Sequence, residues 1–105
     1  MSAFTVFVNP DSKSQKAIPF LLDIQNDLLS PLDTRVVVPL YLKSAGSISP
    51  ISRLTPVITF QGKKLIAMVP ELAGVSKKSL GAAMGDLSAH RAEIISALDL
   101  LVTGF

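Results

Sequence analysis

The chain has 105 residues, which fits one domain, and its lack of cysteine excludes disulfides, thiolate metal sites and a cysteine nucleophile. The formal net charge of +2 and the isoelectric point of about 9.2 favour an acidic partner but do not by themselves indicate nucleic acid. No apolar run approaches the roughly 18 residues of a membrane span, and residues 1–4 show no signal-peptide pattern, so we expect a cytoplasmic protein with no membrane contact.

Two short strands are predicted in the first quarter of the chain. Residues 4–8 form an apolar run of β-formers, and residues 9–16 form a polar loop with one proline. Residues 20–25 alternate in part, which predicts a half-buried strand. One face of that strand would carry Phe20, Leu22 and Ile24, and the other Leu21, Asp23 and Gln25.

A third strand and a hairpin follow. After a connection over residues 26–34, residues 35–40 form a β-branched run ending at Pro39, whose missing N–H suits a strand end or a sheet edge. Residues 41–53 are irregular and predict a loop. The apolar runs 56–60 and 65–69 flank a short polar spacer with glycine, which is a hairpin signal.

A last short strand is possible within residues 72–80, and Gly81, Gly85 and Asp86 then mark a break. From Leu87 the period becomes helical, with Asp86 able to cap the first turn and Gly104 placed where a helix ends. One apolar arc collects Leu87, Ile94, Ile95, Leu98, Leu101 and Val102. We therefore expect a mainly β fold of the α+β class, a small curled antiparallel sheet with one C-terminal helix, in a single domain over residues 1–105.

Apolar content is high for so short a chain, with 49% hydrophobic residues and a mean hydropathy of +0.49. A domain of this size hides about 65% of the surface that its unfolded chain would expose. An apolar patch should therefore remain on the monomer, and such patches mark interfaces. We expect a homo-oligomer, in its simplest form a two-fold dimer.

Few side chains could support catalysis. His90 is the only histidine, and Asp86 lies four residues before it, so the two could touch on a helix and orient a base for serine chemistry. A histidine beside a capping aspartate is more often structural, and one histidine cannot build a histidine-rich metal site. Asp23 and Asp27 also stand four apart, but a strand followed by a turn need not bring them together. No phosphate loop, nucleotide fingerprint or zinc motif is present, so we expect no cofactor and no metal.

Two lysine pairs, Lys63–Lys64 and Lys77–Lys78, could form a basic patch for nucleic acid. The aromatic residues are not interleaved with them as a base-stacking platform requires, so solvated lysines that protect a hairpin and strand edges are the preferred interpretation. At the C-terminus the apolar run continues to Phe105. Two interpretations of Phe105 remain open: it folds back onto the core, or the last turn is presented to a partner.

Five stretches resemble the CcdB toxin family: residues 20–29 (FLLDIQNDLL), 34–40 (TRVVVPL), 56–60 (PVITF), 86–94 (DLSAHRAEI) and 103–105 (TGF). They recur in the family's order across nearly the whole chain. The Asp-[Val/Ile]-Gln-x-Asp segment, the Val-Val-Val-Pro-Leu strand and the Asp-Leu-Ser-x-x-Arg helix start are each weak alone and fairly specific together.

The resemblance implies the toxin of a plasmid-type toxin–antitoxin module, a homodimer with a small SH3-like barrel and a long C-terminal helix. Such toxins bind the A subunit of bacterial DNA gyrase and trap the enzyme on cleaved DNA, without catalysis of their own. A partly disordered CcdA-like antitoxin wraps and neutralises the dimer. The toxin–antitoxin complex represses its own operon, so the toxin meets operator DNA only through that complex.

The stretches that resemble the family also indicate which residues of this chain occupy the family's binding positions. The resemblance places gyrase binding at the end of the helix, with help from the loop after the second strand, on Asp99, Val102, Thr103, Gly104, Phe105, Leu28 and Leu29. It places antitoxin binding on two loops, with Asn9, Asp11, Lys13 and Lys16 in the first and Ala45, Gly46, Ser47 and Ile48 in the second.

One departure bears on toxicity. Thr103 stands where the best-known family members have a tryptophan, whose ring can stack on a partner arginine with a gain of ~1–2 kcal/mol. Threonine cannot do this, although Phe105 could restore an aromatic surface. Two alternatives to the gyrase poison stay open, and Thr103 supports the second of them. One is a MazF-like ribonuclease acting through Arg35, Arg53 and Lys64, and the other is a non-toxic chromosomal relic that binds only an antitoxin.

Overall fold

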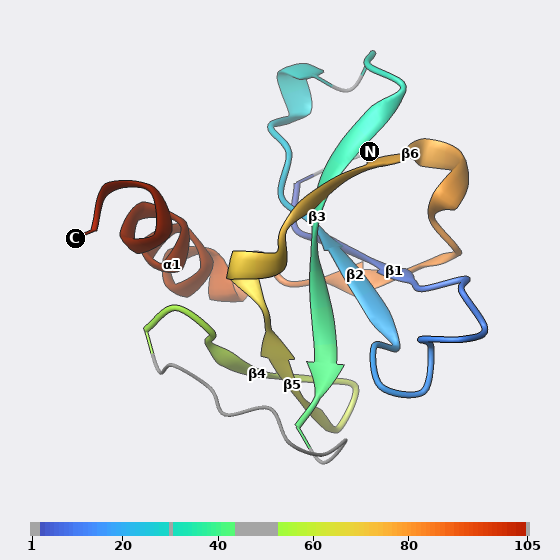
Figure 1. Ribbon diagram of the computed structural model, residues 1–105, viewed down its shortest axis with the longest axis horizontal. Coiled ribbons are helices and arrows are strands. Elements are labelled where there is room, and N and C mark those ends of the chain that lie inside the picture. Colours follow the sequence, from blue (N-terminus) through green and yellow to red (C-terminus); the bar gives the residue numbers. More distant parts are fainter. Residues whose placement is uncertain (1–2, 30, 44–52, 105) are drawn as a thin grey trace.

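Seven strands and one C-terminal helix make up the part of the chain that the computed structural model describes, residues 3–29, 31–43 and 53–104 (Figure 1). The strands are β1 (Thr5–Val8), β2 (Phe20–Asp23), β3 (Thr34–Leu42), β4 (Val57–Phe60), β5 (Lys63–Ala67), β6 (Ala73–Ser76) and β7 (Ala83–Asp86). Single 3-10 turns are η1 (Asp27–Leu29), η2 (Val69–Glu71), η3 (Lys77–Ser79) and η4 (Ser88–His90), and the helix is α1 (Arg91–Thr103). The predicted mainly β class, a curled antiparallel sheet with one terminal helix, is confirmed.

Strand β3 is central to the sheet. The strand order is β4-β5-β3-β2-β1-β7, all neighbours are antiparallel, and β6 also pairs with β3. The first half of β3 pairs with β6 up to Val37, and its end pairs with β5 from Leu40 onward. Pro39 lies between these two ladders, where the missing N–H leaves no ladder bond unmade. The prediction that Pro39 ends the strand or lies at a sheet edge is therefore wrong.

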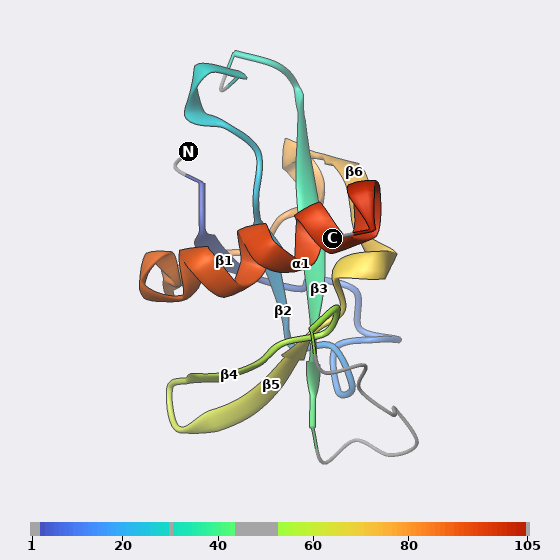
Figure 2. The same ribbon diagram turned by 90° about the vertical axis from the view of Figure 1, so that its left-hand side faces the viewer.

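The core lies between the sheet and α1, which crosses one face of the sheet in Figure 2. Val6, Leu22, Val38, Leu40 and Leu65 are fully buried in the sheet's contribution to this core. From the helix, Ile94 and Ala97 are fully buried against them. Each buried aliphatic side chain contributes roughly 1.5–3 kcal/mol relative to full exposure, so this single cluster holds the helix to the sheet.

The predicted hairpin is the β4–β5 pair. Gln61 and Gly62 form its turn with φ values of 51° and 76°, and two positive φ angles are the mark of a type I′ turn. Phe60 precedes this turn and meets Phe20 edge to face, with the ring centroids 5.2 Å apart. The turn chemistry and the ring contact together fix the register of the hairpin.

The predicted break at residues 81–86 is wrong, because Ala83–Asp86 forms β7 beside β1. The two glycines of this segment allow close packing that a larger residue would prevent. A Cβ on Gly85 would lie 2.8 Å from the Phe60 ring, and one on Gly81 would lie 2.6 Å from the Val8 carbonyl oxygen. The helix also begins later than predicted, at Arg91 after the η4 turn. Its predicted end is confirmed, since Gly104 has φ 80° and donates its N–H to the Leu100 carbonyl.

Candidate functional site

The last turn of α1 presents apolar side chains to solvent. Ile94 and Ala97 are buried, but farther along the helix Leu101 is 39% exposed and Val102 is 79% exposed. The apolar arc is therefore covered along its first turns but not at its C-terminal end, because the helix continues beyond the sheet (Figure 1). Thr103 and Gly104 are exposed too, and Thr103 Oγ1 donates to the Asp99 carbonyl at 2.6 Å. Phe105 lies outside the described residues, so neither interpretation of it is tested.

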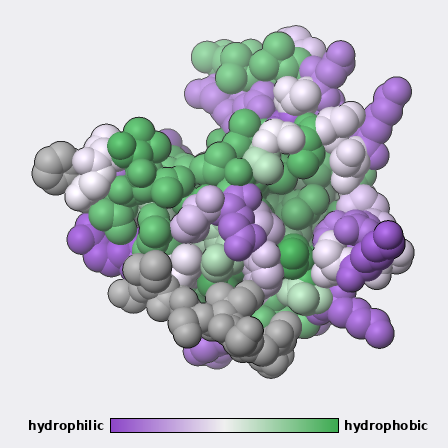
Figure 3. Space-filling view, viewed as in Figure 1, coloured by the Kyte–Doolittle hydropathy of each residue, from purple (hydrophilic) through white to green (hydrophobic). Residues whose placement is uncertain are grey.

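A second exposed apolar turn follows β2. Leu28 is 85% exposed, Leu29 is 47% exposed and Leu32 is 49% exposed. Asn26 caps the turn, since its Oδ1 accepts the Leu28 N–H at 2.8 Å and its carbonyl accepts the Leu29 N–H at 2.9 Å. Hydrophobic surface gathers over this turn and over α1 as two areas (Figure 3), and Figures 1 and 2 keep η1 apart from the C-terminal end of the helix.

Beneath the η1 turn, the sheet buries an ion pair. Arg35 Nε lies 2.8 Å from Asp23 Oδ2 and Arg35 Nη2 lies 3.1 Å from Asp23 Oδ1, with both side chains fully buried. Arg35 Nη2 also donates to the Gln25 carbonyl at 3.1 Å. Nη1 is buried with no hydrogen-bond partner in the described ranges. The predicted half-buried strand is wrong on this face, because the ion pair lets Asp23 and Gln25 be buried as well.

The first candidate antitoxin loop is organised by its own polar side chains. Asn9 is buried and donates through Nδ2 to the Ile18 carbonyl at 2.8 Å and to Ser14 Oγ at 3.0 Å. Asp11 Oδ1 accepts the Lys13 N–H at 3.1 Å. Asp11, Lys13 and Lys16 are exposed, so these three, unlike Asn9, have side chains accessible to a partner. Ala45, Gly46, Ser47 and Ile48 lie outside the described residues.

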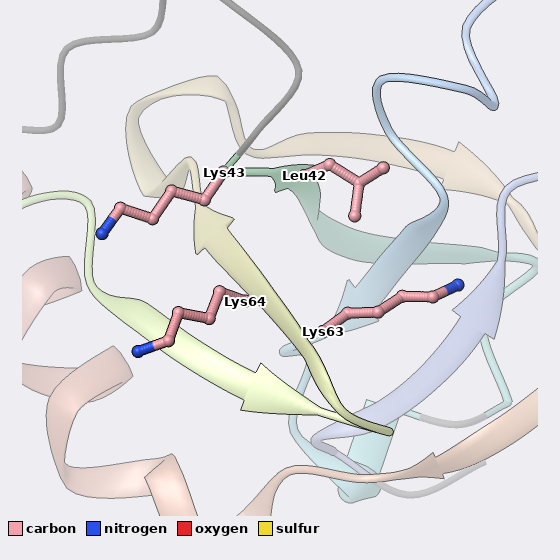
Figure 4. A pocket seen from close by; sticks show the side chains of 4 residues that line it. All are labelled: Leu42, Lys43, Lys63 and Lys64. Carbon is pink, nitrogen blue, oxygen red and sulfur yellow. The ribbon is translucent and has the colours of Figure 1, made fainter.

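A positively charged hollow of about 450 Å³ lies at the end of the β3–β5 ladder, lined by Leu42, Lys43, Lys63 and Lys64. Figure 4 shows Lys43 and Lys64 projecting to one side and Leu42 and Lys63 projecting the opposite way. The Lys43 N–H donates to the Lys64 carbonyl at 3.1 Å, so two like charges stand opposite each other across the ladder. Lys63 Nζ lies 5.7 Å from the centroid of the Phe20 ring.

Of the three residues named for ribonuclease chemistry, Arg35 is not accessible to RNA. Arg35 is fully buried in its ion pair, so its proposed role on RNA is wrong. Arg53 lines a hollow with Pro56, Glu93 and Ser96, whereas Lys64 lines the hollow at the end of the β3–β5 ladder.

Asp86 and His90, which the sequence allowed to pair although a structural role was preferred, have other partners. Asp86 Oδ1 accepts hydrogen bonds from the Ser88 N–H at 2.7 Å and from the Ser88 hydroxyl. These bonds lower the pKa of Asp86, because they stabilise its ionised form. His90 Nδ1 instead lies 3.0 Å from Glu93 Oε1, one turn along on the exposed surface. Asp86 therefore caps the turn that leads into the helix and does not orient a base.

One further titratable group is shifted. Tyr41 Oη donates to Glu71 Oε1 at 2.5 Å, which raises the pKa of Tyr41 to about 12 because the bond favours the neutral phenol beside a carboxylate. Across residues 3–29, 31–43 and 53–104, no three acidic or histidine side chains gather as a metal site. No helix in these same ranges has the length and apolar character to cross a membrane.

Sequence reasoning missed Gln25, Arg35 and Leu32 as parts of the exposed η1 turn and its support. The signal for Arg35 was present, since Asp23 and Arg35 are charged residues within two apolar strand segments, which indicates a buried pair. The uncharged Gln25 gave no such signal. Leu32 carried no signal of its own, because exposure of a single leucine in a connection cannot be read from periodicity.

Comparisons with known proteins show which family the chain belongs to. No curated protein sequence matches it. Among solved structures, an endoribonuclease in complex with its cognate antitoxin from a mycobacterial species superposes with a TM-score of 0.66 at 16% identity, covering 97% of this chain and 94% of that one. At this identity the likeness shows a shared fold alone. The model of the family described as CcdB protein matches residues 3–104, essentially the whole chain, and the chain therefore belongs to the CcdB family.

Proposed function

We propose that the protein is the toxin of a type II toxin–antitoxin module that binds the A subunit of DNA gyrase and traps the gyrase–DNA cleavage complex. Membership of the CcdB family supports the toxin class. The observation that carries the finer proposal is the exposed end of α1, where Val102 is 79% exposed on a turn that the sheet does not cover. Exposed apolar side chains on an ordered helix end are suited to binding a partner.

The mechanism is capture without catalysis. Val102, Thr103, Gly104 and Asp99 would meet an opened form of gyrase, with Phe105 and the Leu28–Leu29 turn in support. A ligand shifts such an equilibrium only by its differential affinity for the trapped form. The toxin must therefore bind gyrase on cleaved DNA more tightly than resting gyrase.

Dimerisation belongs to this proposal. Within one chain, the η1 turn and the end of α1 are separate in both ribbon views. A two-fold dimer would double each surface and could place the helix end of one copy beside that of the other, so that one gyrase surface meets both. A CcdA-like antitoxin would neutralise the dimer, and the pair would repress its operon and contact operator DNA as a complex in the cytoplasm. A role in plasmid maintenance follows if the module is plasmid-borne.

The two rivals predict other outcomes. A MazF-like ribonuclease would cut RNA without gyrase, but the burial of Arg35 removes one of the three residues named for it. A chromosomal relic would bind an antitoxin and leave gyrase unaffected. Thr103 in place of the family tryptophan keeps this second rival open.

The test measures gyrase-dependent DNA breaks with the purified protein, beside the same protein incubated with RNA alone. We expect breaks that need gyrase, and no RNA cleavage. Val102→Asp should lower break formation about tenfold, since a carboxylate would have to be desolvated in the apolar contact. Met84→Asp is the matched control, because Met84 is 40% exposed on β7 and receives the same charge.

RNA cleavage by the parent protein would replace the proposal with the ribonuclease. Parent protein that folds and yields neither breaks nor RNA cleavage would favour the relic. Equal loss in Val102→Asp and Met84→Asp would remove the helix end as the docking surface.

A further inference from the structure

Gln25 connects the exposed η1 turn to the interior of the sheet. Its Nε2 donates to the Leu29 carbonyl at 3.2 Å, and its Oε1 accepts the Val36 N–H at 3.0 Å. The side-chain amide therefore bridges the last residue of η1 and the central strand β3. Gln25 itself is buried, although it lies outside the strand ladder that ends at Asp23.

The backbone of Gln25 is held as firmly as its side chain. Its N–H donates to Asp23 Oδ1 at 2.9 Å, and its carbonyl accepts from Arg35 Nη2 at 3.1 Å. All four polar groups of Gln25 thus have partners. Two of these partners belong to an ion pair whose side chains are fully buried. Such a fully satisfied buried network fixes one conformation.

Within the turn beyond Gln25, the Asn26 side chain caps the Leu28 N–H, but that contact is local to the turn. A single 3-10 turn leaves carbonyls without internal partners, and the Leu29 carbonyl receives the amide of Gln25 together with the Leu32 N–H at 3.0 Å. Leu28 points its apolar side chain into water. A turn that exposes its leucines gains little burial from its shape, so its attachment to the sheet depends on the polar contact beneath it.

We propose that Gln25 is a positioning residue that holds the Leu28–Leu29 turn in its docking conformation, with the Asp23–Arg35 pair fixing Gln25 in turn. Naming gyrase as the partner of that turn rests on the proposed function. The gain for binding is preorganisation: a turn that is already ordered loses less conformational entropy when it docks.

The principal variant is Gln25→Met, which keeps the length of the side chain and removes both amide bonds. Gln25→Glu is the second variant, because it can still accept from Val36 and loses the donor to Leu29. Gln61→Met is the matched control, since Gln61 Nε2 also donates to a backbone carbonyl, that of Met84, at 3.1 Å, but in the β4–β5 hairpin.

The first measurement is native-state amide hydrogen exchange and needs no gyrase. We expect Gln25→Met to speed exchange at the Leu28, Leu29 and Leu32 amides about tenfold, with the Leu22 and Val38 amides unchanged. Gln25→Glu should speed the same turn, and Gln61→Met should leave it unchanged. Unchanged exchange in the turn of both Gln25 variants, or uniformly faster exchange throughout the sheet, would overturn the positioning role.

The second measurement is affinity for the gyrase A subunit in a double-mutant cycle with Leu28→Ser. Gln25→Met should weaken binding about tenfold in the parent and have little further effect beside Leu28→Ser, because it acts through the turn. Full additivity would overturn the inference. If the parent protein does not bind gyrase at all, the proposed function fails, while the exchange measurement still decides whether Gln25 orders the turn.

Discussion

The η1 turn and the end of α1 expose apolar side chains in two different ways. Beneath the turn, Asp23, Gln25 and Arg35 form a buried polar network that reaches Leu29 through a hydrogen bond. At the end of the helix, the hydrogen bonds of the described residues lie within the helix itself, from Thr103 Oγ1 to the Asp99 carbonyl and from the Gly104 N–H to the Leu100 carbonyl.

The two surfaces therefore differ in how easily each can change its conformation. A surface supported by buried polar groups can change only at a large cost to folding, because each lost partner leaves a desolvated group unpaired. A helix end supported by local bonds can fray or bend at little cost and adjust to a partner. In the proposed complex with gyrase, the rigid turn would fix the orientation of the toxin, and the adaptable helix end would adjust to the gyrase surface.

The largest expected effect comes from breaking the buried pair. Arg35→Met leaves Asp23 as an unpaired buried carboxylate and should lower the free energy of unfolding by about 3–5 kcal/mol, measured by urea denaturation. The double variant Asp23→Leu/Arg35→Met should recover most of that loss, since the native pair already leaves Nη1 without a partner in the described ranges. A loss below about 1 kcal/mol in the single variant would contradict the assignment of the turn's stability to this network.

An intermediate effect is expected from a comparison of two glycines with nearly equal φ angles. Gly62 has φ 76° in the β4–β5 hairpin and Gly104 has φ 80° at the end of α1, and a Cβ on either would meet no atom within 4 Å. Gly62→Ala should cost about 1–2 kcal/mol, because the hairpin cannot relax without losing its register. Gly104→Ala should cost only a few tenths, because the last turn can fray instead. Thermal unfolding of both variants checks this, and equal costs would mean that the helix end is as firmly held as the sheet.

The smallest effect concerns an exposed polar contact. The pKa of Tyr41 is raised to about 12, so the stability that its bond to Glu71 contributes is complete below the ordinary pKa of 10 and is lost as the pH rises towards 12. Tyr41→Phe lacks this contribution, so the stability difference between parent and variant should shrink between pH 10 and pH 12. Solvent screening keeps the change below about 1 kcal/mol. Urea denaturation at several pH values measures it, and a constant difference would contradict the bond.

Much of the fold could be predicted from periodicity and turn chemistry. The β4–β5 hairpin followed from a glycine in a polar spacer, and the helix end followed from Gly104. Strand β7 could not be predicted, because Gly85 looks like a break until the Phe60 ring is placed against it. The position of Pro39 within β3 could not be predicted either, because only the sheet shows that β3 changes its partner strand there.

The candidate site was less accessible to sequence reasoning. Exposure of Val102 depends on where the sheet stops covering the helix, which is a tertiary fact. Burial of Asp23 depends on Arg35, which lies 12 residues away, so neither residue reveals the pair alone. The binding roles of Leu28, Leu29, Asp99, Val102, Thr103 and Gly104 came from family resemblance and stay predictions, as do those of the antitoxin loops.

The shared burial of Asp23 and Arg35 also constrains how the family can evolve. A lineage that changes one of these residues must pass through a poorly folded intermediate unless the other changes with it. Positions 23 and 35 should therefore covary among relatives, with acidic and basic residues gained or lost together. Relatives with apolar residues at both positions should also relax their requirement for glutamine at position 25.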